Sequence, residues 1–389
     1  MAKSRSTPLN LYITRIYIEN WRNFSFVDLP LQRRAFFVGP NASGKSNLLD
    51  AFRFLRDIVS EGGGLQEAIR KRFGVSNLRC FAARRYSTIT VKVHIGNDEN
   101  SEIWIYKISF KQNKQRVPYI NEESVWNEGK CILARPNNED LGDPKRLTQT
   151  FLEQLQVNKD FRQVAEFFST IDYLHIVPQL IREPTRLIGF EQDPYGSDFL
   201  EQIAKTNEKT KKAWLKRIQD ALTVAVPQLQ EIKMGRDERG APHLWCKYKH
   251  WRAHGKWQRE EQLSDGTLRL LGLLWITLSG KGPLLLEEPE LNLHPEVVRY
   301  LPRMFSRMQI RTKRQVLIST HAPDMLQDEG IGLDETILLQ PEQKGTKVFT
   351  AAHYEDVQTL LDSGIPLPEA VDPYTKPNEA HQLSQFGEQ

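Results

Sequence analysis

A run of eight residues near the start of the chain, GPNASGKS at 39–46, matches the spacing G-x-x-x-x-G-K-[ST] at every fixed position. Gly39 and Gly44 permit backbone angles that turn successive N–H groups inward, around a group of phosphate oxygens. In such a loop Lys45 reaches the β- and γ-phosphates, and the hydroxyl of Ser46 coordinates Mg²⁺. The spacing therefore predicts a nucleotide-binding loop formed by Gly39, Asn41, Gly44, Lys45 and Ser46.

Paired acids close a run of leucines in LLLEEPELNLHP, residues 284–295. A phosphate-binding loop needs a second acid to hold Mg²⁺, and usually a base that orients the attacking water. A strand over 284–286 would deliver Glu287 and Glu288 to the carboxyl edge of a sheet, where such sites form. We predict that Glu287 supports the metal and that Glu288 polarises the water, provided that the phosphate-loop strand lies nearby in the same sheet. The alternative is a solvated turn after a buried strand.

A histidine follows the next apolar run, LISTHAP at 317–323. If this run is a strand, His321 lies at its tip, one βα unit after the paired acids. A histidine beside the γ-phosphate can bridge phosphate and water, so we predict that His321 takes part in ATP hydrolysis. The alternative is a histidine with an ordinary structural role.

A second anion-binding segment is predicted in QLSDGTLRLLGLL, residues 262–274. Ser264 and Gly266 open a long apolar helix, whose first N–H groups and positive dipole end suit an anion. The alternative is simple helix capping by Ser264 or Asp265. Because the chain already has its own phosphate loop, we expect Ser264 and Gly266 to serve the ATP of another subunit.

The elements that must position these residues follow from the pattern of apolar residues. RRAFFVG (33–39) is a predicted buried strand, and SNLLDAFRFLRDIV (46–59) is a predicted helix behind the phosphate loop. PLLLEE and RQVLIST are further buried strands, with the helix PEVVRYLPRMFSRM between them, and this βαβ alternation predicts a parallel sheet. A strand is expected at 11–20 and antiparallel strands at 88–134. Helices are expected at 145–230 and 267–278, a strand at 244–251, and a loosely held tail from about 365.

Composition limits the class of protein. The 389 residues are 39% hydrophobic and 26% charged, which is typical of a globular protein, and the net charge of +4 neither requires nor excludes nucleic acid. No apolar run is long enough for a membrane span, and no secretory leader is seen, so we expect a cytoplasmic protein without a membrane partner. The three cysteines are too far apart in sequence to indicate a disulfide framework or a zinc site: Cys80, Cys131 and Cys246.

Taken in this order, the phosphate loop, the L-S-D-G segment, the paired acids and the terminal-strand histidine resemble the ABC-type ATPase heads of the RecF, SMC, Rad50 and OLD group. IYIENWRNF (16–24) is similar to the first strand of that group, and EEPELNLHP and STHAP resemble its OLD-like branch of bacterial AAA ATPases, many of which sit in antiphage defence operons. The resemblance implies an α/β P-loop NTPase of the ABC/RecF-like head type, with an antiparallel β subdomain and a compact helical insert. It also implies that ATP and Mg²⁺ are the ligands.

The resemblance assigns roles residue by residue. It implies that Glu288 is the catalytic base, that His321 is the switch histidine, and that Ser264 and Gly266 contact the γ-phosphate of a partner protomer. Asn292 or His294 would lie near the seam of a homodimer or higher homo-oligomer, and Gln179 is a candidate for the Q-loop glutamine. The residues expected to hold the metal are Ser46 and Glu287.

The chain also departs from that group. An SMC or Rad50 chain carries hundreds of coiled-coil residues between the phosphate loop and the L-S-D-G segment, whereas here the insert is compact. OLD nucleases carry a metal-binding TOPRIM domain after the histidine motif, but residues 322–389 contain no D-x-D cluster. We therefore expect an ATPase head that is not itself a nuclease, divided into 1–144, a helical insert at 145–235, a second part of the head at 236–355, and a tail at 356–389.

The predicted function is an ATPase that dimerises head-to-head on ATP and controls a separate effector, a nuclease or toxin, in bacterial antiphage defence. A RecF-like ATPase that clamps DNA and a non-hydrolysing assembly scaffold are the alternatives. Three basic segments bear on nucleic-acid binding, and each has a structural alternative: 69–85, with Arg70, Lys71, Arg72, Arg79, Arg84 and Arg85; 206–217; and 247–259, with Trp251 and Trp257.

Overall fold

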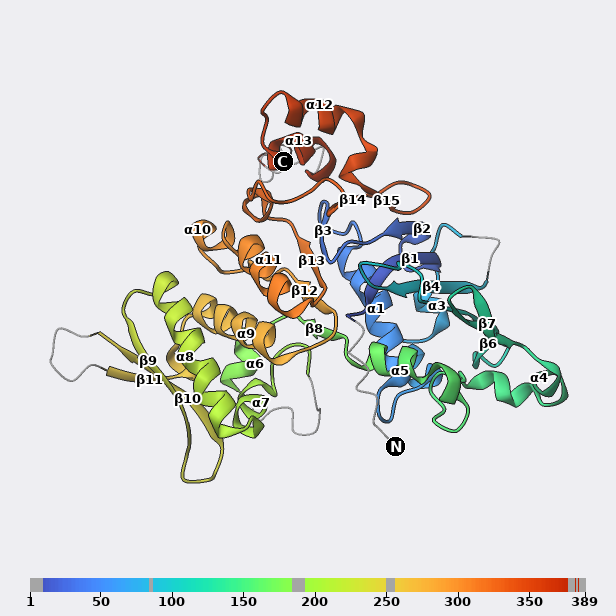
Figure 1. The fold of residues 1–389 in the computed structure, drawn as a ribbon, viewed down its shortest axis with the longest axis horizontal. Coiled ribbons are helices and arrows are strands. Elements are labelled where there is room, and N and C mark those ends of the chain that lie inside the picture. Colours follow the sequence, from blue (N-terminus) through green and yellow to red (C-terminus); the bar gives the residue numbers. More distant parts are fainter. Residues whose placement is uncertain are drawn as a thin grey trace. The chain divides into compact units, whose positions relative to one another are not determined.

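Two six-stranded sheets and one three-stranded sheet organise the chain in a computed structural model (Figure 1). The structure describes residues 10–83, 87–183, 193–249 and 256–376, together with residues 382 and 384. The chain divides into two units. The first contains the described residues up to Asp172, Lys281–Leu285, and those from Arg303 onward; the second contains Tyr173–Gly280 and Leu286–Pro302.

The antiparallel sheet of the first unit has the strand order β2-β1-β4-β5-β6-β7. Its strands alternate apolar and polar residues, so that Ile13, Ile16 and Ile18 of β1 are fully buried while their neighbours are more exposed. Strands β4, β5 and β7 confirm the antiparallel prediction for 88–134. The bounds are β1 (Tyr12–Trp21), β2 (Phe24–Pro30), β4 (Ile89–Gly96), β5 (Trp104–Gln112), β6 (Pro118–Asn127) and β7 (Lys130–Arg135).

The other large sheet has the order β15-β14-β3-β13-β12-β8, in which β13 and β14 run parallel to β3. All five residues of β3 are buried, as the unbroken apolar run predicts for a strand that is covered on both faces. The predicted parallel sheet is therefore confirmed. Its strands are β3 (Arg34–Val38), β8 (Asp172–Leu174), β12 (Leu284–Glu287), β13 (Val316–Thr320), β14 (Thr336–Gln340) and β15 (Lys347–Thr350).

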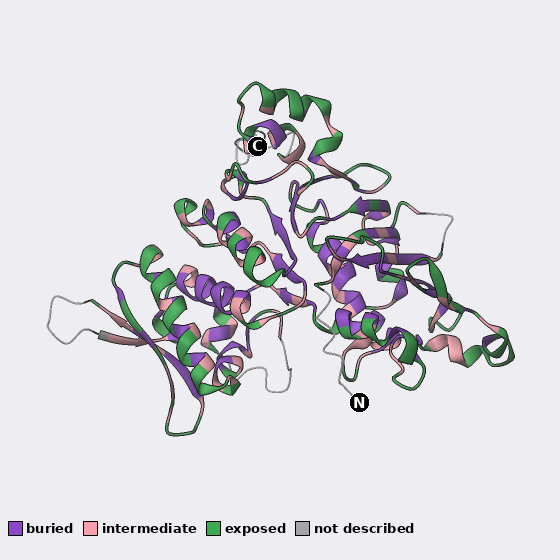
Figure 2. Cartoon of the chain, viewed as in Figure 1, coloured by how far each residue is buried: buried purple, intermediate pink, exposed green. Residues whose placement is uncertain are grey.

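Helices of the first unit surround these strands. Helix α1 (Lys45–Val59) buries Leu48, Phe52 and Leu55 at helical spacing and packs against α2, α5 and β13. Figure 2 shows that its buried face continues the buried interior of the unit. The other helices are α2 (Leu65–Arg70), α3 (Val75–Leu78), α4 (Asn138–Gly142), α5 (Arg162–Ser169), α11 (Leu301–Thr312), α12 (Glu355–Asp362) and α13 (Leu367–Thr375), with short 3-10 turns at Pro144–Thr148, Asn158–Phe161, Pro323–Leu326 and Ala351–His353.

Helix α13 corrects the expectation of a loosely held tail from about residue 365. Its residues Leu367, Ala370 and Val371 are buried, and the helix packs against β14 and α12. Two of the prolines that suggested a loose segment suit a helix start, since Pro366 is the N-cap residue and Pro368 lies in the first turn, whereas Pro373 lies inside the helix, near its end. The boundaries of the predicted domains remain a prediction.

The second unit packs α8 against α9 and against an antiparallel sheet of order β11-β10-β9. Helix α9 is buried along most of its length, as Figure 2 shows, because its apolar residues surround the whole helix. The bounds are α6 (Pro178–Arg182), α7 (Phe199–Lys205), α8 (Glu208–Ala225), β9 (Leu229–Arg236), β10 (Pro242–Tyr248), β11 (Lys256–Arg259), α9 (Asp265–Ser279) and α10 (Pro295–Val298), with a 3-10 turn at Glu260–Gln262. Among the described residues, no helix combines the length and apolar character that crossing a bilayer requires.

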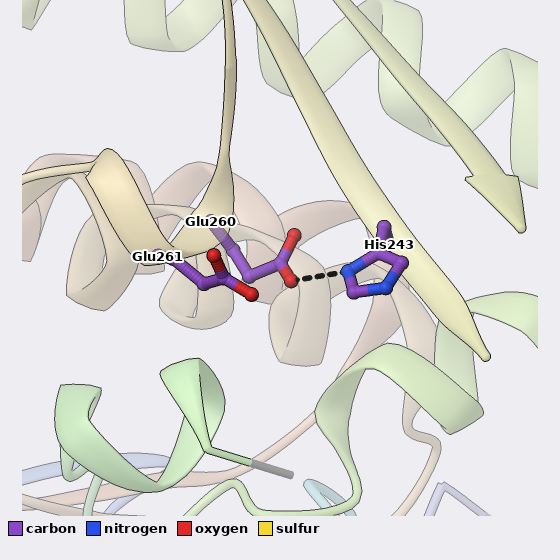
Figure 3. A group of neighbouring side chains, drawn as sticks. All are labelled: His243, Glu260 and Glu261. Atoms are coloured by element: carbon purple, nitrogen blue, oxygen red, sulfur yellow. Dashed lines mark hydrogen bonds and ion pairs between the residues drawn. The ribbon is translucent and has the colours of Figure 1, made fainter. Parts of the chain in front are cut away.

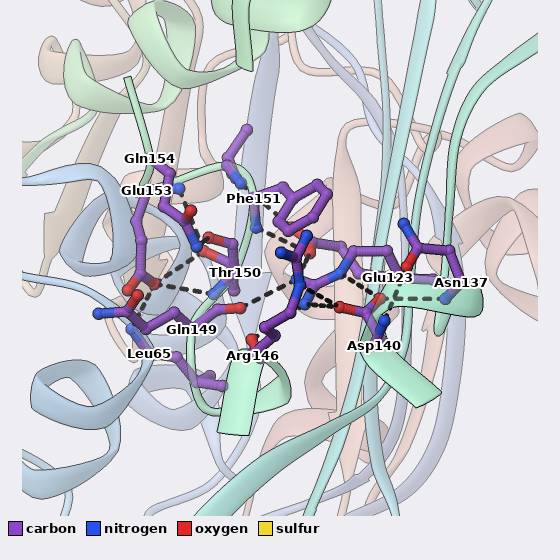
Figure 4. A network of polar contacts seen from close by, with 12 residues as sticks. Leu65, Glu123, Asn137, Asp140, Arg146, Gln149, Thr150, Phe151, Glu153 and Gln154 are labelled. Carbon is purple, nitrogen blue, oxygen red and sulfur yellow. Dashed lines mark hydrogen bonds and ion pairs between the residues drawn. The ribbon is translucent and has the colours of Figure 1, made fainter. Parts of the chain in front are cut away.

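A buried ionic network fixes the end of β7 in the first unit (Figure 4). Arg135 donates to Glu123 Oε2 at 2.9 Å and grips Asp140 through Nε and Nη2 at 2.9 and 2.8 Å. The side chains of all three residues are fully buried. The backbone N–H groups of Phe151 and Leu152 also donate to Glu123, at Oε2 and Oε1 respectively. Both oxygens of this buried carboxylate therefore accept hydrogen bonds.

Candidate nucleotide site

The phosphate loop lies between β3 and α1, as predicted, and two close contacts explain its glycines. Gly44, at φ 100°, is the N-cap residue of α1, and a Cβ there would lie 2.0 Å from Asn23 Nδ2. A Cβ on Gly39 would lie 2.5 Å from the Leu339 carbonyl oxygen. A side chain at either position would displace the neighbouring atoms, so the loop keeps its backbone N–H groups accessible only with glycine.

The polar side chains of this loop fit a phosphate ligand. Lys45 is buried, and its ammonium donates to the carbonyls of Gly39 and Pro40 at 2.8 and 3.0 Å, inside the curve of the loop. The Ser43 hydroxyl is also buried, and it has no hydrogen-bond partner among the described residues. Ser46 is exposed. A lysine ammonium that bonds to carbonyls of the loop, beside two glycines, is the arrangement that a phosphate-binding loop requires.

A turn between β1 and β2 supports the loop, and the sequence interpretation did not single it out. Asn23 Nδ2 donates to the Ser43 carbonyl at 2.8 Å and to Thr346 Oγ1 at 2.7 Å, and Asn23 Oδ1 accepts from Asn47 at 2.8 Å. The Trp21 indole donates to the Asn47 carbonyl at 2.9 Å. The W-R-N-F segment therefore holds the second half of the loop and the first turn of α1. Its only signal in the sequence was the similarity of its strand to the RecF-like group.

A pocket of about 440 Å³ opens beside this turn and the loop. Ala42 of the loop, Arg22, Asn47 and Arg79 line it, together with Phe81, whose residue is 92% exposed. Its volume is in the range of small-ligand sites. A nucleotide whose phosphates occupy the loop could place its ribose and base here, with the Phe81 ring as a stacking surface.

Described residues of the basic run at 69–85 form ion pairs within the first unit or line the pocket beside the phosphate loop. Arg72 is buried and donates to Asp50 and Asp57 at 2.8 Å each, and Arg70 pairs with Glu67 at 2.6 Å. Arg79 lines the pocket beside the loop, while Arg84 and Arg85 lie outside the described residues. These contacts favour the alternative of a loop beside ATP over a surface for DNA.

The other two basic segments lie in the second unit. Residues 206–217 fall on the short link before α8 and on the first part of α8, and strands β10 and β11 pair at Lys247↔Trp257. The Lys233 ammonium lies 4.0 Å from the centre of the Trp257 ring, which is an internal cation–π contact between strands. Trp251 lies outside the described residues. The strand-pair alternative is therefore what the structure shows for the described residues of this segment, 247–249 and 256–259.

His321 lies at the same sheet edge as the phosphate loop. Strands β13 and β3 pair in parallel with Thr320 opposite Val38, so the next residue of each strand, His321 and Gly39, leaves the sheet at the same end. His321 is exposed. The predicted position of the histidine is thus confirmed, and its part in hydrolysis stays a prediction.

The L-S-D-G segment begins α9 in the second unit. Ser264 is the N-cap residue and accepts from Thr267 N at 3.2 Å, so the capping alternative describes what Ser264 does in this protomer. A Cβ on Gly266 would lie 2.5 Å from the Asn292 carbonyl oxygen, which explains the glycine. Asp265 accepts from Arg182 at 2.5 Å and from Asn292 at 3.2 Å. Asn292 is thereby tied to the signature turn.

The paired acids end β12, which belongs to the same sheet as β3, with β13 between them. The prediction for the two acids requires the phosphate-loop strand to lie in the same sheet, and it does. Tyr173, which the sequence did not indicate, donates a hydrogen bond to Glu287 Oε2. Glu288 has φ 45°, in the left-handed region that non-glycine residues rarely adopt. The structure thus places a strained residue where the catalytic base is predicted.

His294 is predicted near the dimer seam and Gln179 as the Q-loop glutamine. His294 is the N-cap residue of α10, and its Nδ1 accepts from Glu296 N at 3.2 Å. Gln179 is exposed in α6. Their proposed roles stay predictions.

One group of three His, Cys, Asp or Glu side chains in the described part of the chain could share a metal ion, namely His243, Glu260 and Glu261 (Figure 3). Glu260 is fully buried, and its two oxygens are used by His243 Nδ1 at 2.7 Å and by Leu244 N at 2.9 Å. These bonds join β10 to the turn that precedes α9. A structural role accounts for all of them.

Comparisons with known proteins agree with this geometry. A family model described as "AAA domain, putative AbiEii toxin, Type IV TA system" matches residues 34–325. An OLD nuclease from Thermus scotoductus (strain ATCC 700910 / SA-01) is 23% identical over 376 residues; the match covers 90% of this chain and 66% of that protein, so the chain spans just under two thirds of its relative.

Solved structures show the same fold. The SMC head bound to the C-winged helix domain of ScpA has a TM-score of 0.54 at 15% identity, over 87% of this chain and 97% of that one. The SMC head with a coiled coil and joint from Pyrococcus yayanosii has a TM-score of 0.50 at 11% identity, over 91% and 100%. The chain has the P-loop fold of these SMC heads, and it belongs to the AAA-domain family whose model matches residues 34–325.

Proposed function

We propose that the chain binds ATP with Mg²⁺, dimerises head-to-head on ATP, hydrolyses it, and thereby controls a separate effector in a bacterial antiphage defence system. The observation that carries the proposal is the phosphate loop, in which the buried Lys45 ammonium bonds to the carbonyls of Gly39 and Pro40 and a Cβ at Gly39 or Gly44 would meet neighbouring atoms. Ser46 and Glu287 would hold the metal, Glu288 would be the base, and His321 would contact the γ-phosphate.

The relatives support the biological setting. The family description names a toxin of a toxin–antitoxin system, and the OLD relative is a nuclease, so an effector that is a toxin or nuclease suits an ATPase of this family. A DNA-clamping role is favoured less, because Arg72 of the basic run is occupied by Asp50 and Asp57. We place the protein in the cytoplasm, where ATP is available.

Mixing two inactive variants tests the head-to-head dimer. Lys45→Ala removes the phosphate contact of a subunit's own site, and Ser264→Arg blocks the site that the subunit offers its neighbour. In a mixed dimer one of the two sites is intact, so a random equal mixture should recover roughly a quarter of wild-type turnover, while each variant alone is inactive. If subunits carrying different tags co-purify but phosphate release does not recover, the composite site is wrong.

The purified chain should hydrolyse ATP without cutting nucleic acid. Nuclease chemistry commonly uses clustered carboxylates that hold one or two divalent metals about 4 Å apart, whereas Glu260 of the described carboxylate–histidine group is already satisfied by His243 and Leu244. Plasmid, linear DNA and tRNA should stay intact with Mg²⁺ or Mn²⁺. Cleavage by the wild-type chain would contradict the ATPase-only function, and equal cleavage by Lys45→Ala would locate the activity outside the ATP site.

A further inference from the structure

Helix α9 carries a buried arginine whose hydrogen-bonding capacity is only partly used among the described residues. Arg269 is 6% exposed, and its Nε and Nη1 atoms have no hydrogen-bond partner in the part of the chain that the structure describes. Buried guanidinium groups are normally paired, because an unpaired charge loses its hydration without compensation. Such a group in a native fold calls for an explanation in terms of function.

The charges around Arg269 identify the segment on which it acts. Burial lowers the pKa of Arg269, while the carboxylates of Asp265, Glu290 and Glu288 raise it. Asp265 is held by Arg182 and Asn292. Glu288 and Glu290 belong to the turn at 287–290 that follows β12, so the field of Arg269 reaches the turn that holds the predicted base.

Arg269 also borders this turn physically. Arg269, Glu287 and Pro289 line a small cavity of about 10 Å³, whose remaining walls are apolar. That volume is close to the space that one water molecule needs. A single water in this cavity would lie against both Arg269 and the turn. Since Glu288 has φ 45°, the turn needs contacts from outside to hold it.

We propose that Arg269 is a positioning residue that holds the acidic turn at 287–290 and so fixes Glu288 for its role as the base of ATP hydrolysis. The inference rests on the proposed function. Ser264, which is predicted to contact the partner's ATP, begins the helix that carries Arg269. The helix would therefore connect the partner's ATP to the turn that holds Glu288. An apolar side chain would suit the buried position better, so a cation there is explained by activity rather than by stability.

Two substitutions at this position separate activity from stability, with Arg217→Met as the control. Arg217 is an exposed arginine of α8. Arg269→Met replaces an unpaired buried charge with an apolar side chain of similar length, so the melting temperature without nucleotide should equal or exceed that of the wild type. Its kcat for ATP should fall about 10- to 100-fold, with KM changed by less than about threefold. Arg269→Lys should recover part of kcat, and Arg217→Met should match the wild type.

Two outcomes would overturn the inference. Wild-type kcat in Arg269→Met would show that the guanidinium does not act on Glu288. A lower melting temperature that accounts for the loss of turnover, with no recovery in Arg269→Lys, would show a structural role. If the wild-type chain and the Arg217→Met control both fail to hydrolyse ATP, the proposed function is overturned, and the inference with it.

Discussion

Glu288→Gln should bind ATP normally and turn it over roughly 10²–10⁴-fold more slowly than the wild type, because a general base contributes about that factor. The substitution keeps the size of the side chain and removes only its ability to accept a proton. Lys45 and the loop, which make the predicted contacts to the phosphates, are unchanged. The variant should therefore accumulate as an ATP-bound dimer, which light scattering after size-exclusion chromatography, with and without ATP, would detect.

The matched control is Glu296→Gln. Glu296 lies on α10 of the same unit, where it pairs with Arg299 on the surface. This variant should keep wild-type turnover and should not be trapped as a dimer. Wild-type turnover in Glu288→Gln would refute the assignment of Glu288 as the base. Loss of ATP binding in that variant would mean that the carboxylate acts on the ground state rather than on the attacking water.

Arg135→Met should destabilise the first unit by about 3–5 kcal/mol at neutral pH, which is the usual effect of removing one partner of a buried ion pair. Glu123 and Asp140 would both lose their cation in a fully buried site. Denaturant unfolding would measure the loss. Arg146→Met is the control, because Arg146 also contacts Asp140, at 3.3 Å, but its side chain is 38% exposed; its effect should stay below about 1 kcal/mol.

The pH dependence of this network has a definite sign. Hydrogen bonding from Arg135 is the main cause that lowers the pKa of Asp140 to about 2 from 3.8. In the wild type this contributes roughly 2 kcal/mol of stability above about pH 4, which is lost as the pH falls towards 2. Burial raises the pKa of Glu123, so its contribution is present at low pH and is lost as the pH rises through that raised value.

Acid should therefore reduce the penalty of Arg135→Met. Without the guanidinium both carboxyl groups are stabilised in their protonated forms, and a protonated carboxyl group costs less to bury than a carboxylate. The difference in unfolding free energy between variant and wild type should shrink between pH 7.5 and 5. A difference that is constant over this range would show that the loss comes from packing, for example against Phe151, over whose ring the Arg135 guanidinium lies at 3.7 Å.

The phosphate loop and the parallel sheet could be predicted because their signals are local. The spacing from Gly39 to Ser46 fixes a loop that needs no distant residue to be recognised, and the unbroken apolar runs at 35–38, 284–286 and 316–318 are typical of strands buried on both faces. The position of His321 followed from chain order alone, because the carboxyl ends of parallel strands meet at one edge.

The contacts that could not be predicted join residues far apart in the chain. Asn23 bonds to Thr346, 323 positions away, and Tyr173 bonds to Glu287, 114 positions away. Nothing in the sequence around Asn23 or Tyr173 indicates these partners, because each bond depends on how strands from different segments are placed. Arg269 is likewise an ordinary residue of an apolar helix in the sequence. The lack of a hydrogen-bond partner for its Nε and Nη1 atoms among the described residues depends on its tertiary surroundings.

The most direct test of the central claim is phosphate release from Mg²⁺·ATP by the purified wild-type chain, measured beside Lys45→Ala. If the loop at 39–46 binds and positions ATP, the wild type should release phosphate continuously and Lys45→Ala should not. Both proteins should have similar melting temperatures without nucleotide, because the bonds that the lysine ammonium donates to the Gly39 and Pro40 carbonyls lie within the loop itself. Equal phosphate release by the two proteins, or none by a folded wild-type chain, would contradict the account.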